Sequence, residues 1–92
     1  MKYIILNAFV KQYDKYEKEK QEMIVSSIER IKEYIETNTA PYGLRIKKLS
    51  QRIYEARVSI DIRILFYRED AIVKYFCLGN HNDVVRCLKS FR

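Results

Sequence analysis

The stretch that decides the fold runs from residue 53 to residue 78 and reads IYEARVSIDIRILFYREDAIVKYFCL. From Ile53 to Ile60 the side chains alternate between two sides, which is the period-two pattern of a β-strand. Two more strands, rich in β-branched and aromatic residues, are expected from Ile62 to Arg68 and from Ala71 to Leu78. Glu69 and Asp70 supply a two-residue turn between them. The stretch therefore predicts a three-stranded antiparallel meander.

The residues before the meander predict one strand and two helices. The apolar run from Tyr3 to Leu6 is typical of a short buried strand, and Phe9, Tyr13 and Tyr16 predict a first helix over about residues 8–19. A second helix carries a stripe of isoleucines at intervals of four, three and four, namely Ile24, Ile28, Ile31 and Ile35. It should end before the turn at residues 38–43, which contains the only Pro.

The residues after the meander predict a short C-terminal helix. Gly79 and Asn80 interrupt the strand pattern, and Val84, Leu88 and Phe91 then recur at helical spacing. The order is β-α-α-β-β-β-α, an α+β fold with two N-terminal helices packed on a mostly antiparallel sheet. The chain of 92 residues is too short for two ordinary domains, so residues 1–92 are expected to form one.

Strand register follows from keeping one face of the sheet apolar. A three-residue connection at residues 60–62 does this, whereas a two-residue connection mixes polar and apolar side chains on both faces. Arg57 then opposes Leu65, Val58 opposes Ile64, and Lys74 opposes Leu65 from the third strand. The apolar face is expected to include Cys77. The other face carries Glu55, Arg57, Ser59, Arg63 and Lys74, interleaved with Tyr67 and Phe76.

The net charge of +6 is unevenly distributed along the chain. Residues 1–40 hold seven basic and seven acidic side chains, and residues 41–92 hold eleven and five. The excess positive charge therefore belongs to the meander, where cations next to aromatic rings suit single-stranded RNA. The alternative is an ordinary solvated face in which Glu55 pairs with Arg57 or Arg63.

Cysteine, histidine and membrane signals are sparse. Two cysteines, Cys77 and Cys87, and one His do not make the four ligands of a structural zinc site, so no metal is expected. A disulfide is possible, but two reduced thiols in the cytoplasm are the prediction. No segment is long and apolar enough to span a bilayer or to act as a secretory signal. His81 opens the final helix, where it could lie beside a phosphate or be an ordinary loop residue while Asn80 or Asn82 caps the helix.

Four segments in order resemble the RelE/ParE toxin superfamily, and most closely its RelE/HigB-like mRNA interferases. They are residues 45–49 (RIKKL), 53–58 (IYEARV), 62–67 (IRILFY) and 79–84 (GNHNDV), and the resemblance runs from about Leu44 to Leu88. It implies a RelE-like fold, ribosome-dependent cleavage of mRNA and a cognate antitoxin that wraps the toxin, giving a hetero-oligomer. Carried over by position, the family's basic residues fall on Arg57, Arg63, His81 and the pair Lys47 and Lys48.

Two positions depart from the family pattern. Val85 stands where several members have a Tyr that packs on the substrate base, and Glu55 stands where many have Lys. The ParE branch, which poisons DNA gyrase, shares the fold and would explain a missing catalytic set. A family member that only binds its antitoxin is a third alternative.

The cleavage chemistry assigns a role to each residue of the predicted site. The ribose 2′-OH attacks the adjacent phosphate, so the reaction needs a base, positive charge and an acid for the leaving oxygen. Glu55 is the expected base, Arg57 and Arg63 stabilise the phosphorane, and His81 is the expected acid. The reaction needs no metal or other cofactor. The predicted RNA-binding residues are Lys47, Lys48, Lys74, Tyr67, Phe76 and Arg86.

Overall fold

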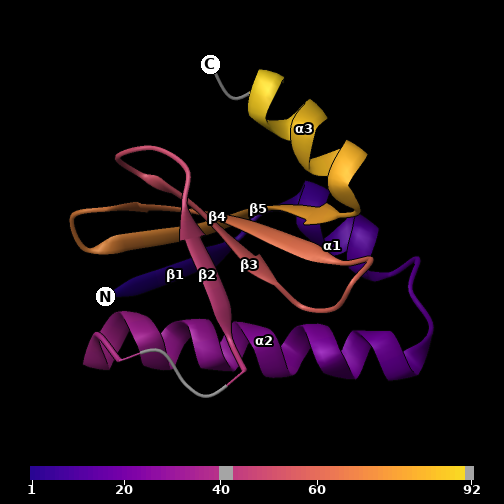
Figure 1. The fold of residues 1–92 in the computed structure, drawn as a ribbon, viewed down its shortest axis with the longest axis horizontal. Coiled ribbons are helices and arrows are strands. Elements are labelled where there is room, and N and C mark those ends of the chain that lie inside the picture. Colours follow the sequence, from indigo (N-terminus) through magenta and orange to yellow (C-terminus); the bar gives the residue numbers. More distant parts are fainter. Residues whose placement is uncertain (40–42, 91–92) are drawn as a thin grey trace.

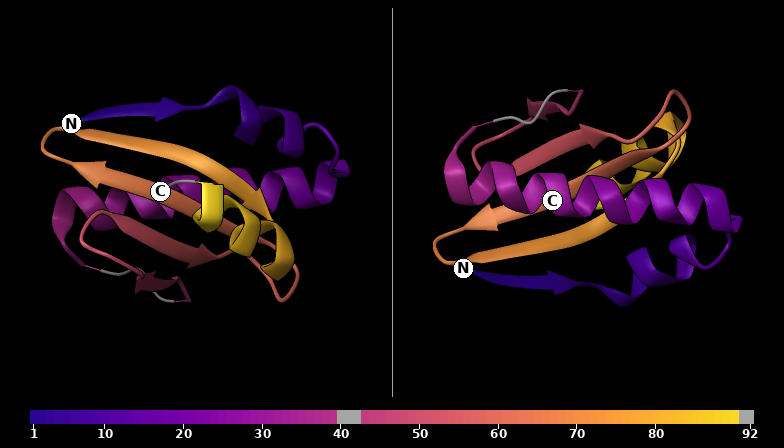
Figure 2. Two further views of the ribbon diagram at one scale, coloured as in Figure 1. Left: turned by 90° about the horizontal axis from the view of Figure 1, so that it is seen from above. Right: turned by 90° about the horizontal axis from the view of Figure 1, so that it is seen from below.

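A five-stranded sheet lies between two unequal helical layers in the computed structural model, which describes residues 1–39 and 43–90. The long helix α2 crosses one face of the sheet, and the short helix α3 lies on the other (Figure 1). The two views in Figure 2 show α3 over the sheet from one side and α2 across it from the other. We call the side of α2 the inner face and the side of α3 the outer face.

The strands follow the order β1-β5-β4-β3-β2 across the sheet. They are β1 (Lys2–Ile5), β2 (Arg45–Lys48), β3 (Ile53–Arg57), β4 (Arg63–Glu69) and β5 (Ile72–Gly79). β1 pairs with β5 in parallel, and the other three pairings are antiparallel. The α+β fold with a mostly antiparallel sheet is thereby confirmed. The structure adds β2, which was expected only as a basic segment before the meander.

The helices are α1 (Asn7–Tyr13), α2 (Lys18–Thr37) and α3 (His81–Ser90). The predicted first helix over residues 8–19 is too long, because the helical conformation is interrupted between Tyr13 and Lys18. Glu17 is extended there, and the Gln21 side-chain amide donates a hydrogen bond of 3.0 Å to the Tyr13 carbonyl. The break turns the chain so that α2 can cross the inner face.

The C-terminal end of α2 lies where it was predicted, just before the turn at residues 38–43. α2 ends at Thr37, its C-cap residue Asn38 is in the left-handed conformation, and Gly43 beyond it has φ +86°. Residues 40–42 of the predicted turn at residues 38–43 lie outside the described residues, and so does the predicted helical residue Phe91.

The register of the meander differs from the expected one by two residues. Arg57 lies opposite Arg63, Ala56 opposite Ile64 and Glu55 opposite Leu65. The loop is longer than predicted, because the Val58 amide donates to the Ile62 carbonyl at 2.9 Å and residues 58–62 leave the ladder. A shift of two keeps every side chain on its own face, so the prediction of the faces survives on β3 and β4.

The turn and the last strand also differ from the expectation. Glu69 pairs with Ile72, so the turn residues are Asp70 and Ala71, and Asp70 has φ +52°, a conformation that Asp tolerates. The predicted pairing of Lys74 with Leu65 is wrong, and Lys74 pairs with Tyr67. A β-bulge at Leu65 and Phe66 then places Cys77 opposite Leu65 and turns Cys77 away from the inner core, where it was expected.

The main core lies between the sheet and α2. Among the described residues it contains twelve buried apolar side chains, including Ile24 and Ile31 from α2, and Phe66 and Tyr75 from the central strands. Phe66 stacks on Tyr54 with ring centroids 5.3 Å apart. The isoleucine stripe and the apolar side of the meander therefore meet as predicted. Within the described residues, no helix has the length and apolar character needed to cross a membrane.

Candidate nucleic-acid interface

Three arginines form a row across the outer face. Arg45 on β2 lies opposite Arg57 on β3, and Arg57 lies opposite Arg63 on β4. Neighbouring strands are about 4.8 Å apart, so the row is about 10 Å long. Like charges directly opposite each other in a sheet are destabilising. This arrangement favours a bound polyanion, whose negative charges would relieve the repulsion.

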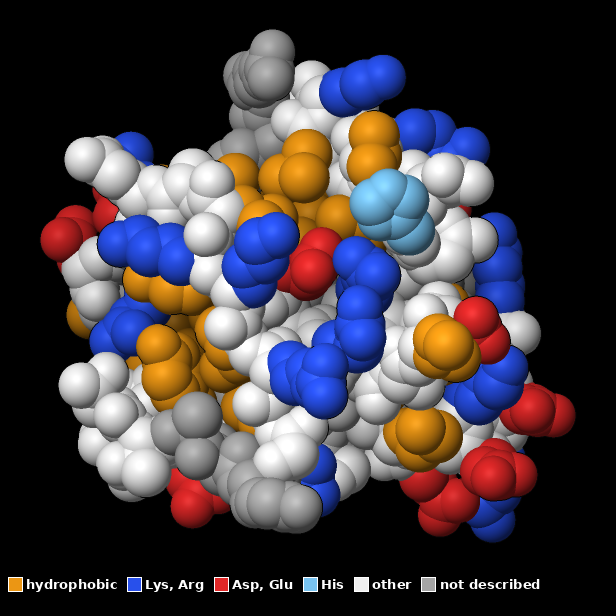
Figure 3. Space-filling view, in the orientation of Figure 1, with side chains coloured by type: hydrophobic (Ala, Val, Ile, Leu, Met, Phe, Trp, Pro, Cys, Tyr) orange, Lys and Arg blue, Asp and Glu red, His pale blue; other side chains and the backbone are white. Residues whose placement is uncertain are grey.

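Glu55 is the acidic group within this basic cluster. One of its carboxylate oxygens lies 3.5 Å from a guanidinium nitrogen of Arg63, and the two side chains are only 17% and 19% exposed. The side chains of Arg45, Arg57 and Lys47 form no ion pair or hydrogen bond with any other described residue. Figure 3 shows Lys and Arg side chains around an acidic group, close to the single His. The cluster thus combines one proton acceptor with an excess of positive charge.

β2 divides the predicted basic pair Lys47 and Lys48 between the two faces. Lys47 lies opposite Glu55 on the outer face. Lys48 lies opposite Tyr54, and its ammonium group is 5.9 Å from the centre of the Tyr54 ring. A hollow of about 450 Å³ at this edge of the sheet is lined by Arg45, Lys47, Glu55 and Arg57, among others. Lys47 therefore belongs to the basic cluster, and Lys48 does not.

His81 lies near the Arg63 end of the row. Arg63 pairs with Gly79, the last residue of β5, and His81 follows two residues later as the first residue of α3. The imidazole is exposed and has no hydrogen-bond or ion-pair partner among the described residues. The fold thus brings the start of α3, with His81, to the end of the sheet where Arg63 lies, although residues 64–80 separate His81 from Arg63 in the sequence.

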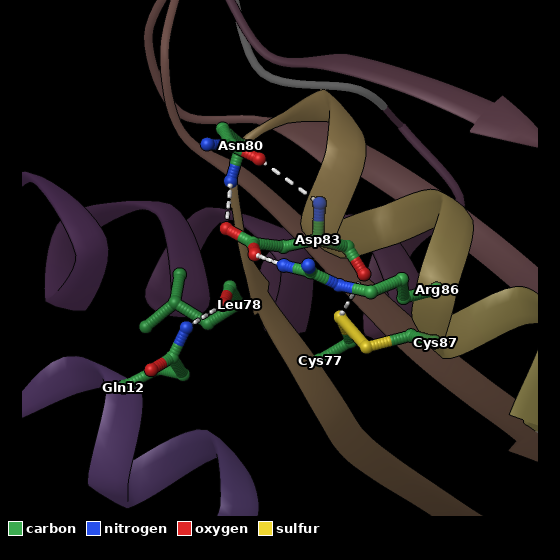
Figure 4. Close-up of polar contacts among 7 residues, drawn as sticks. All are labelled: Gln12, Cys77, Leu78, Asn80, Asp83, Arg86 and Cys87. Atoms are coloured by element: carbon green, nitrogen blue, oxygen red, sulfur yellow. Dashed lines mark hydrogen bonds and ion pairs between the residues drawn. A yellow bond between two sulfur atoms is a disulfide. The ribbon is translucent and has the colours of Figure 1, made fainter.

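A reciprocal cap occupies the beginning of α3. The Asn80 amide donates to an Asp83 carboxylate oxygen, and the Asp83 amide donates to the Asn80 side-chain oxygen, each at 2.9 Å (Figure 4). Arg86 forms an ion pair with the same carboxylate. Asp83 therefore takes the anion position expected at a helix N-terminus, and Asn80 is the cap. Arg86, predicted to bind RNA, lies on α3 with its charge paired and most of its side chain exposed.

The other three predicted RNA-binding residues line a separate hollow. Tyr67, Lys74 and Phe76 border a cavity of about 720 Å³ on the outer face, together with Leu6, Ile53 and the β2–β3 loop. Lys74 and Tyr67 lie opposite each other, whereas Phe76 is the bulged residue of β5. Arg52 in the loop pairs with Glu69 at 3.4 Å, and the Tyr67 hydroxyl donates to the same carboxylate. The predicted site is thus divided into a basic cluster and an aromatic hollow.

The outer face is less open than the sequence predicts, because α3 covers its middle. Val84, Cys87 and Leu88 of α3 pack over Leu65 and Cys77. The prediction of two reduced thiols is wrong, since Cys77 and Cys87 form a disulfide with their Cα atoms 6.4 Å apart. The β-bulge is the physical reason, because it turns Cys77 outward to a position beneath α3.

Arg45 and Arg52 are the basic outer-face residues that sequence reasoning missed. Arg45 belongs to a strand whose four residues, RIKK, show no strong period-two pattern, and only its pairing with Arg57 reveals the row. Among the described residues no group of His, Cys, Asp and Glu side chains could hold a metal ion. The described residues of the site offer cations, the carboxylates of Glu55 and Glu69, the His81 imidazole and aromatic rings.

Comparison with solved structures identifies the fold. The chain is similar to one in the crystal structure of a RelB-RelE antitoxin-toxin complex from Methanococcus jannaschii, with a TM-score of 0.67. The match covers 91% of this chain and 96% of that chain at 17% sequence identity. The protein thus has the RelE-like α+β fold, as the sequence resemblance implied. No protein-family model matches the sequence, and no curated protein matches it.

Proposed function

We propose that this protein is the toxin of a toxin-antitoxin pair and that it cleaves mRNA on the ribosome, in the cytoplasm. The observation that carries the proposal is the row of Arg45, Arg57 and Arg63 beside Glu55, with His81 at its end. A purely structural surface gains nothing from three arginines opposite one another. A phosphate backbone laid along the row would neutralise them.

The groups in this cluster suit cleavage of RNA by its own 2′-hydroxyl. The Glu55 carboxylate accepts the proton of the attacking hydroxyl, while Arg63, 3.5 Å away, stabilises the negative charge that develops on the phosphorane. Arg57 and Arg45 hold the flanking phosphates in the same row. The exposed His81 donates a proton to the departing 5′-oxygen. No step needs a metal ion.

The aromatic hollow supports binding of a second part of the RNA. The residues that line this hollow on β3, β4 and β5 lie up to four residues along the strands from the arginine row, which corresponds to about 13 Å at most. Tyr67 and Phe76 offer ring faces to an unpaired base, and Lys74 offers a cation to its phosphate. We propose that nucleotides next to the cleaved one enter this hollow, with Lys47 guiding the backbone between the two sites.

The partner proposed for this chain is an acidic antitoxin. The structural neighbour is itself an antitoxin-toxin complex, which supports a partner of this kind. A net charge of +6, all of it from residues 41–92, would attract a protein of opposite charge to the same outer face. Antitoxin and RNA would then compete for the basic cluster.

Mapping the 5′ ends of mRNA after brief induction in bacteria tests the proposal. The wild-type chain should stop growth and create new ends within translated regions, whereas Arg63→Ala combined with His81→Ala should abolish them. Each single change is expected to slow cleavage by about 10²-fold or more. Lys48→Ala is the matched control, because Lys48 lies on the other face and should leave cleavage unchanged.

Other outcomes would replace the proposal. Whole mRNA together with DNA damage would indicate a gyrase poison, in which case His81→Ala should have little effect. Normal growth with soluble protein would indicate a chain that only binds its partner. Purified protein with programmed ribosomes and with free mRNA then shows whether cleavage requires the ribosome.

A further inference from the structure

The helix α3 has little apolar contact to hold it on the sheet. Its cluster contains three buried side chains, Leu65, Cys77 and Val84, whereas the inner core has twelve among the described residues. Leu49, Phe76, Cys87 and Leu88, which are themselves only partly buried, pack against this small cluster. By packing alone, α3, which buries only Val84 among its described residues, is therefore held less firmly than α2, which buries four side chains.

Two connections of different kinds hold the two ends of α3. The Asn80–Asp83 cap holds the first turn by reciprocal hydrogen bonds, and the buried Gly79 lets Asp83 lie directly against the end of β5. The disulfide from Cys77 on β5 to Cys87, ten residues further along the chain, holds the C-terminal half of α3 (Figure 4). Of these two, only the disulfide can be opened by redox chemistry.

We propose that the Cys77–Cys87 disulfide is a redox-sensitive latch that keeps the C-terminal half of α3 on the outer face. In the chain-entropy picture, closing a loop of about ten residues favours the docked helix by up to about a hundredfold. Loss of the bond leaves only the partly exposed contacts of Cys87 and Leu88 to hold residues 85–90. The capped first turn stays in place, so the helix opens from its C-terminal end.

Opening of the latch is a thiol–disulfide exchange with a dithiol reductant. A thiolate of the reductant attacks the sulfur of Cys87, the more exposed of the two residues, and releases the Cys77 thiolate. The second thiol of the reductant then attacks the mixed disulfide and frees Cys87. Two protein thiols and one oxidised dithiol result, so two electrons pass from the reductant to the protein.

The position of α3 gives the latch a consequence for the outer face. α3 lies over Leu65 and Cys77, which separate the Arg63 end of the basic cluster from Phe76 in the aromatic hollow. Release of its C-terminal half uncovers Leu65 and widens the path between the two. The latch therefore sets how much of the outer face a partner can reach, whichever partner that is.

Hydrogen exchange of the whole protein, oxidised and after treatment with dithiothreitol, tests the latch. The amides of residues 85–90 should exchange about tenfold to a hundredfold faster in the reduced protein, with α2 unchanged. Cys87→Ser should exchange at the fast rate in both conditions. This measurement does not depend on RNA cleavage, so the latch and the proposed function can fail separately.

Three results would overturn the latch. Equal exchange of α3 in both redox states would mean that the bond does not hold the helix. Faster exchange throughout α2 and β4 would mean that the disulfide stabilises the whole domain. Alkylation and mass measurement of the air-oxidised protein that found two free thiols would mean that the bond does not form.

Discussion

The two faces of the sheet are built on different physical principles. The inner face meets α2 through a continuous apolar core in which Ile24, Ile31, Ile64 and Phe66 are completely buried. The outer face carries three opposed arginines, a largely buried Glu55 and a hollow, and a short helix covers only its middle. One face supplies most of the free energy of folding, and the other holds groups that would be more stable with an anionic partner.

This contrast explains how so small a chain can maintain an unfavourable surface. A core of this size tolerates repulsion of a few tenths of a kcal/mol for each pair of like charges on the other face. Substitutions should therefore divide by face, with inner changes altering stability and outer changes altering binding. Substitutions at four positions test this division, beginning with the largest expected effect.

Phe66→Ala should destabilise the protein most. Phe66 is fully buried and packs against Tyr54 and Tyr75. Its truncation leaves a cavity and should lower the free energy of unfolding by about 3–5 kcal/mol, as measured in urea. The exposed outer-face variant Lys47→Ala should stay within about 0.5 kcal/mol of the wild type. Similar losses for the two variants would contradict the contrast between the faces.

Gly79→Ala tests the junction between β5 and α3. A Cβ atom at residue 79 would lie 2.5 Å from the Cβ of Asp83, so the first turn of α3 would have to move. The expected loss is about 1–3 kcal/mol, accompanied by faster hydrogen exchange in α3. Asn82→Ala, at an exposed position in the same turn, is the control and should have little effect. If Gly79→Ala is as stable as the control, the close packing of Asp83 is not required.

Tyr75→Phe should stabilise the protein by about 1 kcal/mol at neutral pH. The Tyr75 hydroxyl is buried and has no hydrogen-bond partner among the described residues, so its removal ends an unfavourable burial. Burial, with a smaller contribution from Tyr3, raises the pKa of Tyr75 far above its ordinary value of 10.0.

The raised pKa of Tyr75 also predicts a pH dependence. Above pH 10 the unfolded chain loses the Tyr75 proton while the folded chain keeps it, so stability falls as pH rises. From pH 10 to pH 11 the wild type should lose about 1 kcal/mol more than Tyr75→Phe does, by urea unfolding at each pH. Parallel pH profiles for the two proteins would be incompatible with a buried Tyr75 hydroxyl.

Arg57→Gln should have the smallest effect on stability, in the opposite direction to an ordinary mutation. Arg57 faces Arg45 on one side and Arg63 on the other, so its neutralisation removes two repulsive pairs. Unfolding should cost about 0.2–1 kcal/mol more, while binding of single-stranded RNA weakens and its salt dependence falls by about 0.7 of a unit of slope. Lys48→Gln should change neither quantity by as much. If Arg57→Gln were more stable than the wild type but bound RNA equally well, the arginine row would not be part of the RNA-binding site.

The alternation in β3 and β4 predicted the faces correctly because side chains in a strand change sides at every residue. It did not predict the register, since a shift by two residues leaves the faces unchanged. The basic residues that β3 and β4 place on the outer face could therefore be found from sequence, but not the opposition of Arg57 and Arg63. Arg45 was missed because β2 has four residues and becomes a strand only through its pairing with β3.

The sequence by itself determined the α+β class, the apolar inner face and the location of the positive charge, because these depend on local periodicity and composition. Only the tertiary structure decided the arginine row, the division of Lys47 from Lys48, the pairing of Arg63 with Gly79 just before His81, and the disulfide beneath α3. Each of these depends on loop length, a β-bulge or pairing between distant segments. Such features are set by the packing of the whole chain, and the local pattern does not encode them.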